Sequence, residues 1–339
     1  MSLNRRGLLA AGPALSCLAL PFLARPALAQ GNGAPGNGAP WAPTHPVRFV
    51  VPFPAGGATD VVARVLGERL QQRLGQPVVV ENRTGSGGNL GMENAAHSAA
   101  DGHTLVMATM GTLSINQHLY RNLGFDPAKS FAPISMAFGT DHVLIVNPGV
   151  PARTAQDFVA LAKEKGGGIS YGSAGSGSST HMVAELFRLA AGIQPMHVPY
   201  RGSAPALNDT IAGTVQFMLD QLPSAIGQIQ AGTVRALATT GPRRSALLPE
   251  VPTMAEVGLP AAEATSWGAV LAPAGTPLAA IARYNQAIRE ILAEPGAQER
   301  LAAAGADAVS STPGELAATI QRESDKWGRV VQEAKITVN

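Results

Sequence analysis

The 339-residue sequence contains a single cysteine, Cys17, which lies close to the N-terminus. Residues 1–29 have the pattern of a cleavable export signal, because Arg5 and Arg6 precede an apolar run and small residues lead up to Ala29. The chain that remains after cleavage has no thiol. Disulfide bonds, cysteine nucleophiles and metals or cofactors held by cysteine are therefore excluded from it.

The apolar run is also a poor membrane span, since Gly12, Pro13 and Pro21 interrupt it and a spanning helix needs about 20 unbroken apolar residues. The pair Arg5-Arg6 resembles a twin-arginine signal, although two arginines also occur in ordinary secretory signals. We therefore expect export to the periplasm, by a route that the residues leave open.

An excess of charge of one sign is missing as well. Loss of the three arginines of the signal leaves 22 basic and 23 acidic residues, a formal net charge of −1. The chain thus has no electrostatic footprint for nucleic acid. Residues 30–45 are rich in glycine, proline and asparagine, and they predict a flexible tether.

The usual catalytic and nucleotide motifs are missing too. No glycine-rich loop is followed by GK[ST], there is no HExxH, and the seven histidines are scattered without metal-ligand spacing. GISYG at 168–172 matches GxSxG on paper, but Ser170 is predicted to start a strand, whereas a nucleophile elbow needs a turn from strand to helix. We expect no cofactor and no metal.

What is present is an alternation of short β-branched runs with amphipathic stretches. This pattern is typical of parallel strands crossed by helices, and it predicts an α/β fold. The predicted strands are RFVVPF, PVVVEN, HTLVMAT, HVLIVNP, ISYGSA, MHVPY, VQFMLD, VRALATT and AVLAP.

Between these strands, apolar residues recur at helical spacing at 62–74 and 183–190, which predicts helices there. Strands fade after Leu271, and two long helices are predicted at Pro277–Glu294 and Pro313–Ala334, each with proline at its start. We expect these helices to pack back onto an earlier part of the chain.

Three loops of small residues each follow a predicted strand and precede a predicted helix. They are PFPAGGATD at 52–60, RTGSGGNLG at 83–91 and YGSAGSGSSTH at 171–181. Helix N-termini carry unpaired N–H groups and a positive dipole end, so these loops suit an anion. Glycine also makes any tight turn, but three such loops favour a binding site.

Two further loops end strands in the same way and contain Met110 and Tyr200-Arg201-Gly202. Arg201 is a candidate contact to a carboxylate, or a surface arginine. Asp60, beside Thr59, is expected to cap or charge its helix, and Asp220 either caps the next helix or accepts a ligand N–H. A triad of Ser176 or Ser178 with His181 and Asp220 is conceivable, but a structural role for His181 is favoured.

The amino-acid sequences of several segments indicate a more specific function. The following segments resemble the Bug family, the extracytoplasmic receptors of tripartite tricarboxylate transporters: VPFPAGGATDVVARVLGERL, PVVVENRTGSGGNLG, SINQHLY, YGSAGSGSSTHMVAELF, VPYRGSAPALNDTIAG, VQFMLDQLPSA, IQAGTVRALATTGPRRSALLPEVPTMAEVG and WGAVLAPAGTP. They come in the family's order, and the resemblance runs from about Pro46 to the end.

The resemblance implies a two-lobed type II periplasmic-binding-protein fold, with mainly parallel sheets flanked by helices and two crossover strands. It implies lobe one at 46–146 with 267–339, and lobe two at 147–266. It also implies that backbone N–H groups of 53–57 and 86–89 capture a carboxylate, and that 175–180, 200–202 and Asp220 close over the solute. Ala55, Ala58 and Gln221-Leu222 depart from the family's pattern.

From both arguments the expected ligand-binding residues are Phe53, Pro54, Ala55, Gly56, Gly57, Thr59, Asp60, Ser86, Gly87, Gly88, Asn89, Met110, Gly175, Ser176, Gly177, Ser178, Thr180, His181, Tyr200, Arg201, Gly202 and Asp220. We expect a monomeric receptor that delivers a dicarboxylate, amino acid or aromatic acid to the transporter's membrane subunits and performs no chemistry. The alternatives are an enzyme on the same fold, such as a hydrolase, and a ligand sensor that docks a signalling protein.

Overall fold

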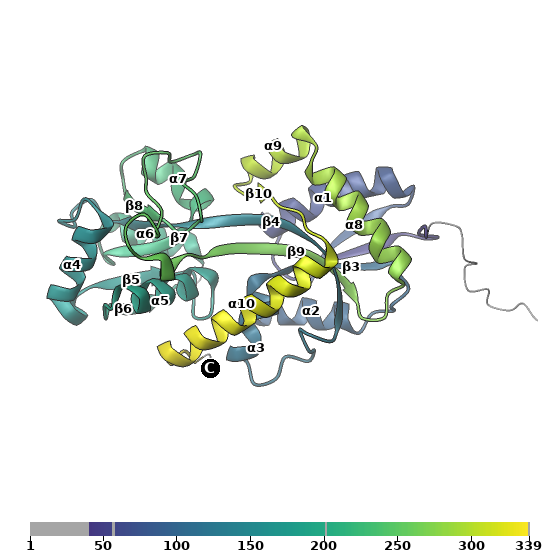
Figure 1. Ribbon diagram of the computed structural model, residues 1–339, viewed down its shortest axis with the longest axis horizontal. Coiled ribbons are helices and arrows are strands. Elements are labelled where there is room, and N and C mark those ends of the chain that lie inside the picture. Colours follow the sequence, from purple (N-terminus) through teal and green to yellow (C-terminus); the bar gives the residue numbers. More distant parts are fainter. Residues whose placement is uncertain (1–40, 56–57, 201, 338–339) are drawn as a thin grey trace, which may run out of the picture. The chain divides into compact units, whose positions relative to one another are not determined.

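A mixed sheet of ten strands organises the part of the chain that the structure describes (Figure 1). The structure is a computed structural model, and it describes residues 41–55, 58–200 and 202–337. The predicted export signal therefore lies outside the described residues. So do three of the expected site residues, Gly56, Gly57 and Arg201.

The strands alternate with helices, as the sequence predicts. The strands are β1 (Val47–Val51), β2 (Val78–Asn82), β3 (Thr104–Thr109), β4 (Phe131–Val146), β5 (Ser170–Ser173), β6 (Met196–Pro199), β7 (Phe217–Gln221), β8 (Arg235–Thr239), β9 (Thr265–Pro273) and β10 (Asp307–Ala308). The α-helices are α1 (Ala58–Leu74), α2 (Asn89–Ala96), α3 (Asn116–Leu119), α4 (Ala155–Lys165), α5 (Ser179–Ala191), α6 (Ser203–Ala212), α7 (Leu222–Gln230), α8 (Leu278–Leu292), α9 (Pro295–Ala303) and α10 (Pro313–Ala334). Shorter helical turns are η1 (Ser86–Gly88), η2 (Gly111–Ile115), η3 (Gly166–Gly168) and η4 (Pro260–Ala262).

The strand order is β2-β1-β3-β9-β4-β7-β5-β6, and β8 and β10 also pair with β4. Strands β1, β2 and β3 run parallel and form what we call the first strand set. Strands β5, β6 and β7 run parallel and form the second strand set. The sheet is mixed because the two crossover strands, β4 and β9, run antiparallel to their neighbours.

Strand β4 is shared by both halves of the sheet. Its first part pairs with β9, and its last residues pair with β7 and β8. Thr109 at the end of β3 pairs with Gly268 of β9, which pairs with Phe138, and Gln221 at the end of β7 pairs with His142. The carboxyl ends of both strand sets therefore point toward the middle of β4, the place where open α/β sheets bind ligands.

Helices cover both faces of the sheet. Around the first strand set, α1, α8 and α9 bury one apolar cluster that includes Phe49, Leu66, Leu70 and Ile288. A second cluster, on the side of α2, α5 and α10, includes Trp267 and Trp327. The predicted return of the C-terminal helices onto an earlier part is confirmed, since α8 packs on α1 and β4.

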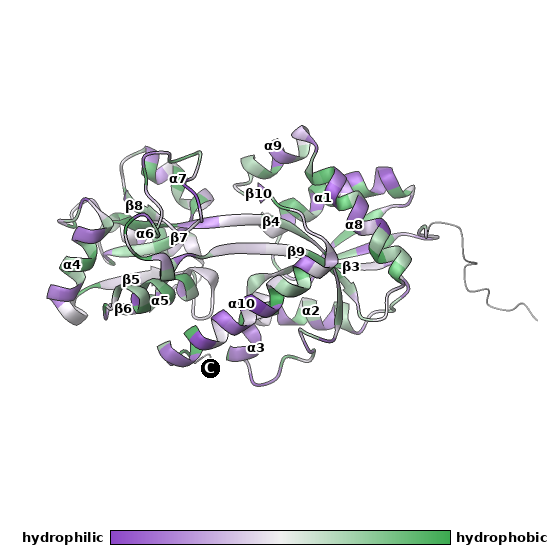
Figure 2. Cartoon of the chain, viewed as in Figure 1, coloured by the Kyte–Doolittle hydropathy of each residue, from purple (hydrophilic) through white to green (hydrophobic). Residues whose placement is uncertain are grey.

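Helix α10 begins and ends where the sequence predicts it. Thr312 and Glu315 form a capping box at its start, with Pro313 in the first turn. Hydrophilic and hydrophobic residues alternate along it in Figure 2, and its apolar side includes the buried Trp327. This side packs on η2, α3 and β4, and also on α5 of the other half. Helix α10 thus contacts both halves of the sheet.

The end of the predicted tether is packed against the fold. Trp41 lies 5.3 Å from the ring of Tyr284 and contacts Gly102, because glycine leaves space for the indole. Among the helices of the described chain, none combines the length and the apolar character that a membrane crossing requires.

Candidate functional site

The loops after β1, β2 and β3 meet around Gly88. A Cβ atom placed on Gly88 would lie 2.8 Å from Cγ2 of Thr112 and 3.1 Å from Cζ of Phe53, and its φ of 96° is in the left-handed region. Only glycine fits both the backbone and this space. The glycine run of the second loop therefore does more than turn the chain, since it lets three loops come together.

Asn89 follows at the first position of α2 and is nearly buried, with 4% of its surface exposed. The Asn116 amide donates to Asn89 Oδ1 at 2.6 Å and to the Gly87 carbonyl at 3.2 Å. Within the described residues, Asn89 Nδ2 has no hydrogen-bond partner. Since a buried amide donor is costly to leave unpaired, this N–H group points to a partner from outside the chain.

Asp60 is almost fully buried at the start of α1. The Asn82 amide donates to Asp60 Oδ1 and to the Phe53 carbonyl, both at 2.9 Å, and Arg64 Nε donates to Asp60 Oδ2 at 2.8 Å. Asp60 therefore ties the helix start to the end of β2, and this agrees with its expected role at the helix N-terminus.

The other expected residues of this set differ in exposure. Pro54, Ala55, Ser86 and Gly87 are exposed, and Thr59 is partly buried at the start of α1. Met110 is 1% exposed and packs in the apolar cluster with Trp267.

The loop after β5 is held by its own side chains. Ala174 N donates to Thr180 Oγ1 at 2.8 Å, and Gly177 N donates to His181 Nδ1 at 3.0 Å. Ser178 caps α5 by accepting from His181 N. Ser176 is the exposed residue of this loop. The backbone N–H groups of Ala174 and Gly177 already have acceptors within the chain.

The loop after β6 runs beside the loop after β5. Tyr200 N donates to the Ser173 carbonyl at 3.0 Å, and Gly202 N donates to the Ala174 carbonyl at 3.1 Å. A Cβ on Gly175 would lie 3.1 Å from the Tyr200 carbonyl. The Tyr200 hydroxyl donates to Asp209 at 2.6 Å, and burial, followed by this bond, raises the pKa of Tyr200 to about 12.

Asp220 is fully buried at the end of β7. Its carboxylate accepts from Ser203 Oγ at 2.8 Å, from Gln221 N at 2.9 Å and from Ser224 Oγ. Ser203 opens α6 and Ser224 lies in the first turn of α7, so Asp220 fixes two helix starts at once. Burial raises the pKa of this carboxyl group above its ordinary value.

Three stacked aromatic rings lie next to the loops after β5 and β6. His181 and His197 are nearly parallel with ring centroids 3.9 Å apart, and His197 stacks on Tyr171 at 4.9 Å. His197 Nε2 lies 2.6 Å from Ser173 Oγ. Burial lowers the pKa of both histidines, that of His181 to about 3, so both rings are neutral at pH 7.

The conceivable serine triad is not formed by these residues. His181 Nδ1 accepts from Gly177 N, and the Asp220 carboxylate is bonded to Ser203, Ser224 and its neighbour's N–H. No bond joins His181 to Asp220 within the described chain. The prediction that Ser170 starts a strand is confirmed, because it is the first residue of β5.

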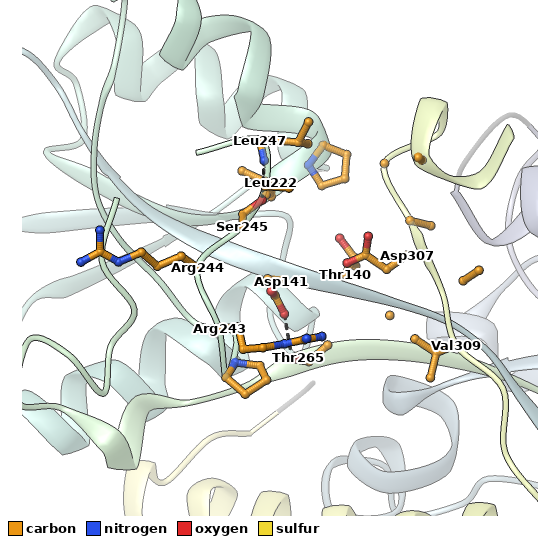
Figure 3. Close-up of a pocket in the computed structure, with 18 of the residues that line it drawn as sticks. Thr140, Asp141, Leu222, Arg243, Arg244, Ser245, Leu247, Thr265, Asp307 and Val309 are labelled. Atoms are coloured by element: carbon orange, nitrogen blue, oxygen red, sulfur yellow. Dashed lines mark hydrogen bonds between the residues drawn. The ribbon is translucent and has the colours of Figure 1, made fainter. Parts of the chain in front are cut away.

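A pocket of about 760 Å³ lies beside the crossover strands (Figure 3). Thr265 Oγ1 of β9 donates to Asp141 Oδ1 of β4 at 2.8 Å, and burial raises the pKa of Asp141. The other walls of the pocket come from α7, the segment 242–247, α9 and β10. None of the expected ligand-binding residues lines it.

Sequence reasoning missed the side chains that position the loops. The following residues all contact expected site residues: Thr112, Asn116, Asn82, Ser203, Ser224 and His197. Asn116 lies within SINQHLY, one of the segments that carry the family resemblance, and this was the signal that could have identified it. Within the described chain, no hydrogen bond joins the loops of the first strand set to those of the second.

Comparison with known proteins decides the family. Residues 62–336 match the model of the tripartite tricarboxylate transporter family receptors. The chain belongs to this receptor family. It is a family of solute-binding receptors and not of enzymes, which removes the enzyme alternative.

Solved structures agree with this assignment and with the predicted fold. The receptor is 33% identical to the periplasmic binding protein BugD, over 87% of this chain and all of that one, with a TM-score of 0.74. It is 34% identical to Rpa4515 of R. palustris with adipate (87% and 99% covered, TM-score 0.77). It is 32% identical to MatC of Rhodopseudomonas palustris with bound malate (85% and 99% covered, TM-score 0.73). The receptor thus has the α/β periplasmic-binding-protein fold, with a mixed sheet flanked by helices.

Proposed function

We propose that the receptor binds a small carboxylated solute, with a dicarboxylate favoured, at the carboxyl ends of the two strand sets. One observation carries the proposal: the buried Asn89 amide has an unpartnered N–H donor at the start of α2, beside Gly88 in the left-handed conformation. A carboxylate oxygen satisfies such a donor and interacts favourably with the helix N-terminus. Adipate and malate in the related structures support this class of solute.

The loops of the first strand set would supply the primary carboxylate contact, through the Asn89 amide and the N–H groups of 53–57 and 86–89. The loops at 175–180 and 200–202 would then close over the rest of the molecule. Asp220 would act indirectly, because its carboxylate already accepts from three donors and fixes the starts of α6 and α7.

In this proposal residues 46–146 with 267–339 form one lobe and residues 147–266 form the other. Strands β4 and β9 would serve as the hinge, since they are the strands that connect the two halves of the sheet. A solute that contacts both lobes only in the closed form shifts the population toward that form. The periplasmic, monomeric receptor would then deliver it to the transporter's membrane subunits.

A ligand screen tests the proposal. The exported protein is unfolded and refolded to remove any bound solute, and its melting temperature is measured with dicarboxylates, amino acids and aromatic acids. A solute at 100 times its Kd stabilises a protein by about 2.7 kcal/mol, which gives a clear shift. The recovered solute is expected to be chemically unchanged. If no member of the panel shifts the melting temperature, the proposal is wrong.

A further inference from the structure

Two histidines and an aspartate meet at the amino ends of β1 and β3, whereas the loops discussed above follow the carboxyl ends of the strands. His45 lies just before β1, and Asp101 and His103 lie just before β3. One potential ligand atom from each residue lies within 4.8 Å of the other two. His45 and Asp101 are exposed and His103 is partly buried, so the cluster is open to solvent on one side.

We propose that His45, Asp101 and His103 bind one divalent transition-metal ion of the zinc class. From the sequence alone no metal is expected, because His45 is distant along the chain from Asp101 and His103 and the histidines lack metal-ligand spacing. Strand pairing brings them together, since β1 pairs directly with β3 and Arg48 N donates to the His103 carbonyl at 2.8 Å.

The two histidine rings lie close enough together to share an ion once one of them turns. Their centroids are 3.6 Å apart and their planes differ by 8°. Zinc binds imidazole nitrogen at about 2.0–2.1 Å in tetrahedral geometry, so two ligand nitrogens lie roughly 3.4 Å apart. The two rings are close enough for this distance, but imidazole lone pairs lie in the ring plane, so two nearly parallel rings do not aim at one ion. The exposed His45 side chain would therefore have to rotate out of the stack to bring a nitrogen to an ion held by Asp101 and His103.

One unsatisfied atom also points to an ion. His103 Nδ1 is buried without a hydrogen-bond partner in the described chain, although Asp101 Oδ1 lies only 3.3 Å from it. Asp101 Oδ1 is held in place by accepting from His103 N at 2.9 Å. An ion between the imidazole nitrogen and the carboxylate oxygen would satisfy both atoms.

Metal binding at Nδ1 has a consequence for Thr44. Without metal, Thr44 N donates to His103 Nε2 at 3.1 Å, so Nε2 is the acceptor and the ring's proton lies on Nδ1. When a metal replaces that proton, the ring's proton moves to Nε2, and Thr44 N loses its acceptor. The Thr44 amide is therefore expected to exchange with solvent faster when metal is bound.

The ligand set selects the kind of ion. Two imidazoles and one carboxylate favour zinc, nickel or copper, whereas magnesium and calcium prefer an all-oxygen set. Three protein ligands leave a fourth position for water. The ion would hold the segment of Trp41 and His45 to the loop before β3, independently of the solute site.

The test is calorimetric titration of the tag-free exported protein, treated with EDTA and dialysed, with zinc chloride. We expect one equivalent to bind, with no competition from excess magnesium. His45→Ala and Asp101→Asn are each expected to weaken binding by at least about tenfold. The matched control is His97→Ala, because His97 is an exposed histidine of the same half that lies outside the cluster; its affinity should stay unchanged.

Melting temperatures in EDTA first confirm that each variant folds, which is expected for the exposed His45. Zinc should then raise the melting temperature of the wild type and of His97→Ala but not of His45→Ala. Equal zinc affinity in His45→Ala and His97→Ala would overturn the proposal. So would an absence of binding to the wild type at about 1 mM zinc, since this is far weaker than a three-ligand site.

Discussion

The glycine-rich loops of the two strand sets differ in how their hydrogen-bond donors are used. In the first set, Gly88 leaves room for Phe53 and Thr112, and the neighbouring Asn89 amide keeps an unpartnered donor. In the second set, the donors at Ala174 and Gly177 are already bonded to Thr180 and His181. Two loops that look alike in sequence therefore differ in what they can offer a ligand.

This difference indicates a division of roles. A loop with an unpartnered buried donor gains from an external acceptor, whereas a loop with an internal network keeps its shape without one. Under the proposed function, the first set would bind the carboxylate strongly, and the second would provide a preformed surface that closes on it.

A large effect on solute affinity is expected at Gly88. In Gly88→Val the new side chain collides with Thr112 and Phe53, and the left-handed backbone is strained as well. We expect solute affinity to fall by about a hundredfold, or roughly 2.7 kcal/mol, in a calorimetric titration. Gly167→Ala is the control, because no atom lies within 4 Å of its Cβ position; an equal loss there would refute the steric explanation.

A smaller effect, on stability, is expected at Asp220. Asp220→Ala leaves the Ser203 and Ser224 hydroxyls and the Gln221 N–H without their acceptor, at a cost of about 1–3 kcal/mol in the free energy of unfolding. Urea denaturation measures this loss. Asp220→Asn keeps one acceptor oxygen and should lose less. If both variants are as stable as the wild type, Asp220 does not fix the two helix starts.

The histidines of the second strand set should also make the protein's stability depend on pH. The pKa of His181 is about 3 in the folded protein because of burial and the neighbouring His197, against an ordinary value of about 6.5. As pH falls below 6.5, the unfolded chain binds a proton that the folded chain excludes. The contribution of the neutral histidine to the free energy of unfolding is therefore fully present above pH 6.5. It is lost as the pH falls toward 3, by up to about 1.4 kcal/mol per pH unit for each such histidine.

Urea titrations at pH 7, 6 and 5 measure this slope. His142, which is fully buried with a pKa lowered to about 3 by burial, and His197, whose pKa is also lowered, contribute to the same window. Glu185 acts in the opposite direction on His197. His181→Gln should reduce the slope without removing it, and an unchanged slope would show that His181 titrates normally.

Much of the fold could be predicted from the sequence, because its parallel strands are short apolar runs between clear helices. The first part of β4, Phe131–Asp141, was missed. It contains Pro133 and Gly139, and register shifts near Pro133 and Met136 interrupt its pairing with β9. Such bulges break the alternation by which a strand is recognised. The predicted helix at Pro277–Glu294 is confirmed as α8, but α9, which starts at Pro295, was not predicted.

The site was only partly predictable. Glycine-rich turns after strands indicate where a ligand can approach a backbone, and Gly88 and Gly175 lie at such places. The partners of those loops come from distant positions, such as Asn116 for Asn89 and Ser203 for Asp220. Their convergence depends on strand register and helix packing, and neither leaves a local mark in the sequence.

Asn89→Asp tests the central claim most directly. The substitution keeps the oxygen that accepts from Asn116 and replaces the unpartnered Nδ2 donor by a carboxylate oxygen. Titration of the refolded variant with the best dicarboxylate of the screen should show binding at least about a hundredfold weaker than that of the wild type, because two like charges would meet. Unchanged affinity would contradict the account, since the solute's carboxylate would then lie elsewhere.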